Sequence, residues 1–136
     1  MSIRTDFDSP FVDSSITVAS FVAGRERLFP SIAFTRKPIT PEETEELFKA
    51  SASLEGASFL AHCRSYICKY VESWCYSKSA SFVAMSPESA AKLKHPVAVA
   101  LYNVAVGFVA SDEIPADWNW PGHVISSDTP EAIAGK

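Results

Sequence analysis

The feature that most constrains the fold is an apolar stripe at helical spacing between residues 57 and 75. The members of the stripe lie at positions i, i+4, i+7, i+8, i+11 and i+15, so one face of a helix would carry all of them. We therefore expect a long helix over 57–75 at the centre of the core. The members of the stripe are Phe59, Cys63, Tyr66, Ile67, Tyr70 and Trp74.

Three further helices are predicted from their start and stop signals. A capping box of Thr40 and Glu43, with proline between them, begins a helix over 40–54 whose sparse apolar positions leave one face solvated. A second start of the same kind, a capping serine followed by proline at 86–87, begins a short helix over 86–95. It should end there because the residue before a proline disfavours helical angles. That proline then begins a last helix over 96–110.

Two runs rich in β-branched and apolar residues precede these helices. Residues 16–22 and 28–35 are separated by a polar segment that contains Gly24, which predicts a β-hairpin. Pro30 cannot donate a ladder hydrogen bond, so the second strand is expected at an edge of the sheet. A third short strand is expected around 81–83.

These elements predict an α+β fold, with an N-terminal β-hairpin packed beside a bundle of three to four helices. A chain of 136 residues is enough for one domain, and 47% hydrophobic with 21% charged residues is the composition of a globular protein. We place the domain at 16–110, after an N-terminal arm or short edge strand at 1–15. Residues 111–136 are turn-rich and polar and are interpreted as an extended C-terminal tail.

Composition also excludes several classes of function. The formal charge of −4 argues against a nucleic-acid partner, and the absence of a run of about 18 apolar residues argues against a membrane span. The N-terminus lacks the pattern of a secretory signal peptide. Three clustered cysteines, Cys63, Cys68 and Cys75, form a poor disulfide framework and indicate reduced thiols in the cytoplasm.

No motif for catalysis, a cofactor or a metal stands out. The five glycines form no Gly-x-Gly pair, the serines lack the Gly-x-Ser-x-Gly setting, and the cysteines lack the Cys-x2-Cys spacing of a zinc site. We therefore expect no cofactor, no metal and no enzymatic activity. One catalytic alternative stays open, in which Cys63 is a nucleophile with His95 or His123 as its base. A buried, inert thiol is the interpretation we prefer.

Contacts with other proteins are expected from the hairpin and the tail. Large aromatic side chains in a polar tail often mark contacts, although two tryptophans can equally fold back onto the core. Two arginines at the hairpin tip could contact an acidic partner or simply solubilise the turn. The contact candidates are Ile32 and Phe34 at the hairpin edge, Arg25 and Arg27 at its tip, and Trp118 and Trp120 in the tail.

The order of segments is also informative. FTRKPIT at 34–40 leads into an acidic helix, YVESW at 70–74 closes a long helix, and MSPESAAKL at 85–93 precedes a final apolar helix with LYNV at 101–104. Over residues 16–108 this layout resembles the small tail assembly chaperones and related tail-region proteins of tailed bacteriophages. Those proteins often begin with a strand region and continue as a helical domain.

The resemblance implies a non-enzymatic role through protein–protein contacts. Such chaperones bind the long tape-measure protein, keep its apolar helices soluble and help to recruit tail-tube subunits, in the cytoplasm of the infected host cell. One alternative is a structural subunit of a phage particle (an adaptor, connector or decoration protein), which would be found in the virion. Another is a phage-encoded inhibitor of a host protein. The high apolar fraction makes a homo-oligomer plausible.

Overall fold

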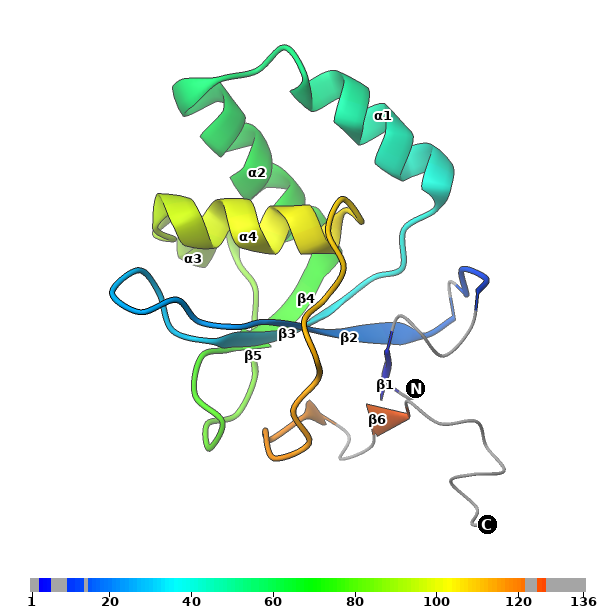
Figure 1. Ribbon diagram of the computed structural model, residues 1–136, viewed down its shortest axis with the longest axis vertical. Helices are drawn as coiled ribbons and strands as arrows, with labels where there is room; N and C mark the ends of the chain where they lie inside the picture. Colours follow the sequence, from blue (N-terminus) through cyan, green and yellow to red (C-terminus); the bar gives the residue numbers. More distant parts are fainter. Residues whose placement is uncertain (1–2, 6–9, 14, 122–124, 127–136) are drawn as a thin grey trace.

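The computed structural model describes residues 3–5, 10–13, 15–121 and 125–126. Its described part folds into a mixed β-sheet with four α-helices above one face (Figure 1). The predicted α+β class is confirmed. The hairpin, however, is part of a larger sheet, which runs in the order β5-β4-β3-β2-β1-β6.

The sheet combines antiparallel and parallel pairs. β1 runs parallel to β2 and to β6, and the remaining neighbours are antiparallel. The strands are β1 Ile3–Arg4, β2 Thr17–Val22, β3 Ile32–Arg36, β4 Val71–Cys75, β5 Val83–Ala84 and β6 Ile125–Ser126; the helices are α1 Pro41–Ser51, α2 Gly56–Tyr70, α3 Pro87–Ala91 and α4 His95–Ala105.

The predicted hairpin is confirmed, but the prediction that its second strand is an edge strand is wrong. β2 and β3 pair from Val22 with Ile32 to Val18 with Arg36. β3 begins after Pro30, so the proline interrupts no ladder. Its other side pairs with β4, which places β3 inside the sheet.

The long helix predicted over 57–75 ends early, and this is the main correction. α2 stops at Tyr70, and Val71 enters the extended conformation with φ −84° and ψ 123°. Residues 71–75 form β4, because a β-branched and an aromatic side chain suit a strand and β3 offers an open edge. Trp74, on this strand, packs against the apolar cluster between the sheet and the helices. Residue 74, four positions after Tyr70, can reach the core from a helix or from a strand. The spacing alone therefore did not distinguish a helix from a strand over 71–75.

The capping box of α1 is confirmed. The Thr40 hydroxyl accepts from the Glu43 N–H at 3.2 Å, and the Glu43 carboxylate accepts from the Thr40 N–H at 3.0 Å. The serine start of α3 is confirmed as well, since the Ser86 hydroxyl accepts from the Ser89 N–H at 3.1 Å. These local signals fixed both starts because donor and acceptor lie within one turn.

α4 ends at Ala105 rather than at the predicted Ala110. Gly107 has φ +88°, a backbone conformation that glycine adopts without strain. A Cβ at this position would lie 3.0 Å from Oγ1 of Thr44 on α1. The chain therefore turns sharply at Gly107 and passes close to α1.

Two apolar clusters lie on opposite faces of the sheet, as the alternation of side chains along a strand requires. Ile32 and Phe34 belong to the main cluster beneath the helices. Phe21 and Ala33 belong to the second cluster, which also contains Trp120. Each face of the sheet thus has its own apolar cover.

The C-terminal segment 111–121 is the cover of the second face (Figure 1). The Phe21 N–H donates to the Ser111 hydroxyl at 2.8 Å, and the Asp112 N–H donates to the Phe21 carbonyl at 2.9 Å. This segment occupies the side of β2 that the two-residue β1 leaves open. Of the predicted tail, residues 122–124 and 127–136 lie outside the described residues.

Candidate functional site

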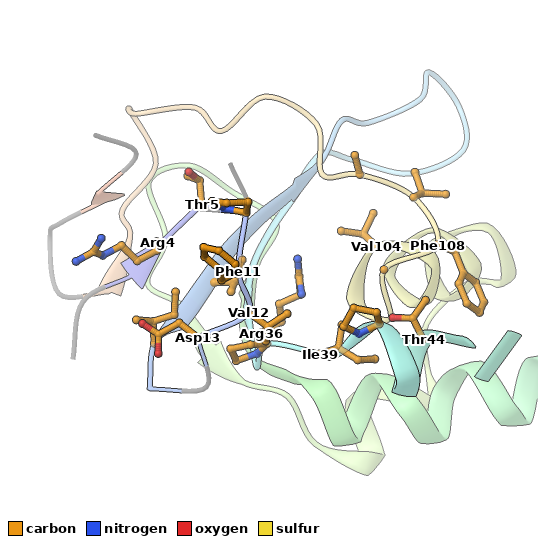
Figure 2. Close-up of a pocket in the computed structure, with 18 of the residues that line it drawn as sticks. Arg4, Thr5, Phe11, Val12, Asp13, Arg36, Ile39, Thr44, Val104 and Phe108 are labelled. Carbon is orange, nitrogen blue, oxygen red and sulfur yellow. The ribbon is translucent and has the colours of Figure 1, made fainter. Parts of the chain in front are cut away.

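A hollow of about 1180 Å³ opens between the N-terminal part of the chain and α1 (Figure 2). Residues 10–13 and the start of β2 form one wall. The first turns of α1 and the turn after α4 form the other, and the end of β3 lies between them. We call this feature the groove; its lining is Arg4, Thr5, Pro10, Phe11, Val12, Asp13, Ile16, Val18, Arg36, Pro38, Ile39, Pro41, Thr44, Glu45, Phe48, Val104, Gly107, Phe108, Val109 and Ala110.

Exposed apolar side chains concentrate at the groove. Seven large hydrophobic side chains are exposed among the described residues, and four of them line the groove. Such a concentration in a concave site is typical of surfaces that bind another molecule. The four are Phe11, Val12, Phe48 and Val109, which are 80%, 46%, 63% and 52% exposed.

The helical wall of the groove is fixed by contacts between α1 and the end of α4. The Thr44 hydroxyl donates to the Val106 carbonyl at 2.7 Å. The rings of Phe48 and Phe108 meet edge to face with centroids 5.8 Å apart. Phe48 therefore projects from a rigid support. This favours binding, because its side chain loses little conformational entropy when a partner binds.

Charged groups are spaced around the apolar lining. Glu45 stands on the helical wall and Asp13 on the opposite wall. The Asp13 carboxylate accepts from the side chain and the N–H of Ser15, at 2.6 and 3.0 Å, and these bonds lower its pKa. Arg36, only 5% exposed, donates from Nε to the Ser20 hydroxyl at 2.9 Å.

The contact candidates from the sequence lie elsewhere. Ile32 and Phe34 are 2% and 0% exposed in the main core, so in this fold they stabilise the sheet and are not at its surface. Their strand is internal, contrary to the predicted edge. Arg25 and Arg27 are exposed in the loop between β2 and β3, as the hairpin prediction required.

The two tail tryptophans have folded back onto the sheet. Trp120 is 4% exposed, and its indole N–H donates to the Pro115 carbonyl at 2.8 Å. Trp118 is half-buried, and its ring meets that of Phe21 edge to face with centroids 5.4 Å apart. The structure thus brings the tryptophans together in one cluster and supports the second of the two alternatives left open for them.

The groove itself was missed by the sequence reasoning. One signal was present, because Phe48 is one of the few large apolar residues on a helix that was expected to have a solvated face. Phe11 and Val12 gave a second signal as an apolar pair in a polar arm. Neither signal says that the two segments face each other, which depends on the tertiary fold.

No protein family, curated protein or solved structure matches this chain. Evidence about function therefore comes from the residues themselves. Within the described part of the chain, no helix is long and apolar enough to cross a membrane. In the same part, no three His, Cys, Asp or Glu side chains are grouped so that they could hold a metal ion.

The cysteine alternative gains no support from geometry. Cys63 is 0% exposed, and burial raises the pKa of its thiol to about 11, which keeps it protonated and unreactive. Its neighbour His62 instead places Nε2 2.7 Å from the hydroxyl of Tyr102, whose pKa burial raises to about 12. His95 is exposed at the start of α4, and His123 lies outside the described residues.

Acidification is expected to destabilise the fold through His62. Burial lowers the pKa of His62, so the folded chain binds this proton less readily than the unfolded chain, whose histidine has a pKa of about 6.5. The free energy of unfolding should therefore fall as the pH drops below about 6.5, until the folded-state pKa is passed. Urea unfolding of the native protein and of His62→Gln, from about pH 7.5 to about pH 5, measures this. Equal pH slopes for the two proteins would contradict the prediction.

Proposed function

We propose that this protein is a non-enzymatic assembly protein that acts through protein–protein contacts, in the manner of a phage tail assembly chaperone. The observation that carries the proposal is the groove, where four exposed apolar side chains surround a hollow of about 1180 Å³. A chaperone of this kind must cover an apolar segment of its client, and an apolar groove with charged groups at its walls can do so. The order of segments that resembles the tail assembly chaperones supports the same role.

The chemistry of the remaining residues is consistent with a binding protein. Cys63 and Tyr102 have raised pKa values because they are buried, so neither is an activated nucleophile or base. Glu43, one of the four glutamates of α1, is engaged in the capping box and accepts from the Tyr70 hydroxyl at 3.3 Å. These groups stabilise the fold, and the groove is left as the site for a client.

Removing two of the exposed apolar side chains of the groove is expected to weaken capture of the client. The experiment compares tagged native protein with a Phe48→Ser/Val109→Ser variant in the cell where the chain is naturally made. Co-purifying proteins are measured by quantitative mass spectrometry. We expect the native protein to recover a long helical tail protein or tail-tube subunits, and the variant to recover on the order of tenfold less, since two anchors of an interface are lost.

A matched control is available on another surface. Tyr76 and Val83 are 63% and 58% exposed, close to the values for Phe48 and Val109, and neither lines the groove. A Tyr76→Ser/Val83→Ser variant should retain the client. If the groove variant also retains it, the groove is not the binding site. Recovery of capsid or connector proteins would instead support a structural subunit, and recovery of a host enzyme would support an inhibitor.

A further inference from the structure

The loop between β2 and β3 is a second surface feature, separate from the groove. It projects from one end of the sheet, on the left of Figure 1, while α1 lies toward the other end. Arg25 and Arg27 on the loop and Lys94 before α4 are exposed, and they line a hollow of about 580 Å³. Glu26 is the one acidic residue of this lining. The hollow is therefore basic, on the surface of a chain whose net charge is −4.

The described part of the chain does not neutralise the cations of the hollow. Lys49 and Lys78 form ion pairs with carboxylates elsewhere on the surface, whereas Arg25, Arg27 and Lys94 form none with any described residue. Like charges that share one hollow repel each other, and this repulsion costs free energy. A bound carboxylate would offset that cost.

Arg27 is held in a backbone conformation that suits glycine. Its φ is +68°, in the left-handed region where a residue with a Cβ is strained. The Leu28 N–H donates to the Arg25 carbonyl at 2.9 Å, which makes Arg27 the third residue of a tight turn. An arginine that only made the loop soluble could stand at any exposed position without strain. Its place at this one indicates that the guanidinium group is needed at the tip of the loop.

The loop is also preorganised, and it carries an apolar side chain. The Arg25 N–H donates to the carbonyl of Phe29 at 3.0 Å, and the Phe29 side chain is buried in the main cluster. At the base of the loop, the Gly24 N–H donates to the Ser31 hydroxyl at 2.8 Å. Leu28 lines the hollow and is 40% exposed. Guanidinium groups and an apolar side chain are thus presented together on a loop that loses little conformational entropy on binding.

We propose that this hollow binds an acidic segment of a partner protein. Carboxylates of the segment pair with Arg25, Arg27 and Lys94, and an apolar side chain of the segment packs against Leu28. A guanidinium group can bind a carboxylate through two parallel hydrogen bonds, which gives the contact a defined geometry as well as strength. A peptide suits the hollow better than a nucleic acid, because the net charge of −4 repels a long polyanion and a nucleic acid offers no aliphatic side chain to Leu28.

This inference goes beyond the proposed function and does not depend on it, because the hollow and the groove share no lining residue. The groove variant Phe48→Ser/Val109→Ser should therefore bind an acidic segment as the native protein does. That result separates failure of this contact from failure of the proposed function.

The test is fluorescence anisotropy of a labelled peptide mixed with the full-length protein at low salt. The probe is the peptide Glu-Glu-Leu-Glu-Glu, and its counterpart has Gln in place of each Glu. We expect the native protein to bind the acidic probe, more weakly as the salt concentration rises, and to leave the Gln counterpart unbound. Arg27→Gln should raise the dissociation constant by on the order of tenfold. Lys37→Gln removes the same charge from an exposed position at the other end of β3, so it should bind the probe like the native protein.

Arg27→Gly separates a binding role from a structural one. Glycine fits the left-handed conformation, so this variant should unfold at the same or a higher urea concentration than the native protein. It should nevertheless bind the probe as weakly as Arg27→Gln. Native-like binding by either Arg27 variant would overturn the proposal, and so would equal binding of the two peptides or no binding at about 1 mM native protein. Tighter binding of a single-stranded oligonucleotide of the same charge would also overturn it, because the hollow would then be a nucleic-acid surface.

Discussion

Replacing Trp120 with alanine is expected to lower the free energy of unfolding by about 3–5 kcal/mol. Trp120 is 4% exposed, its ring lies 5.1 Å from that of Phe82, and its indole N–H is bonded to the Pro115 carbonyl. The substitution would leave a cavity in the cluster that covers one face of the sheet. Urea unfolding followed by circular dichroism gives the free energy of both proteins.

Trp118 provides the matched control for this substitution. It belongs to the same segment but is only half-buried, so Trp118→Ala should lower the free energy of unfolding by clearly less. Equal losses for the two variants, or a loss below about 1 kcal/mol for Trp120→Ala, would mean that segment 111–121 is not part of the core. Truncation after Ala110 should then also be harmless, whereas we expect it to destabilise more than Trp120→Ala.

Replacing Phe34 with alanine should be equally damaging, with a loss of about 3–5 kcal/mol. Phe34 is 0% exposed on β3, which pairs with strands on both sides. The same substitution at Phe48, which is 63% exposed, should change the free energy of unfolding by less than about 0.5 kcal/mol. Phe48→Ala should instead weaken capture of the client. The same substitution at the two phenylalanines therefore distinguishes a core position from a position on the contact surface.

The reverse pattern would contradict the assignment of both residues. A stable Phe34→Ala protein that loses its client would return Phe34 to the contact surface where the sequence reasoning had placed it. A Phe48→Ala protein that unfolds would show that the ring contact with Phe108 belongs to the core. Urea unfolding and client capture, measured on the same two preparations, decide between these outcomes.

Elements whose signals are local were predicted well. The capping box of Thr40 and Glu43, the serine start at Ser86 and the β2–β3 hairpin all depend on residues within a few positions of each other. Their hydrogen bonds form between neighbours, so the rest of the fold has little influence on them. The α+β class followed from the same elements.

The errors arose where a distant partner decides the conformation. Residues 71–75 satisfy the helical stripe and the strand pattern alike, and they form β4 because β3 supplies hydrogen-bond partners. The same pairing placed β3 inside the sheet, and Ile32 and Phe34 are buried because the helices pack over that face of it. The groove required α1, the turn at Gly107 and residues 10–13 to meet, and no local pattern encodes that meeting.

By itself, the sequence determined where two of the helices and the hairpin begin, the α+β class and the basic tip of the β2–β3 loop. The helix starts and the hairpin depend on hydrogen bonds and φ/ψ preferences within one turn. Only the tertiary structure decided which strand is internal, which tryptophan is buried and which apolar side chains remain exposed around the groove. Burial depends on contacts between segments far apart in the chain, and it decides here which residues stabilise the fold and which can bind another molecule.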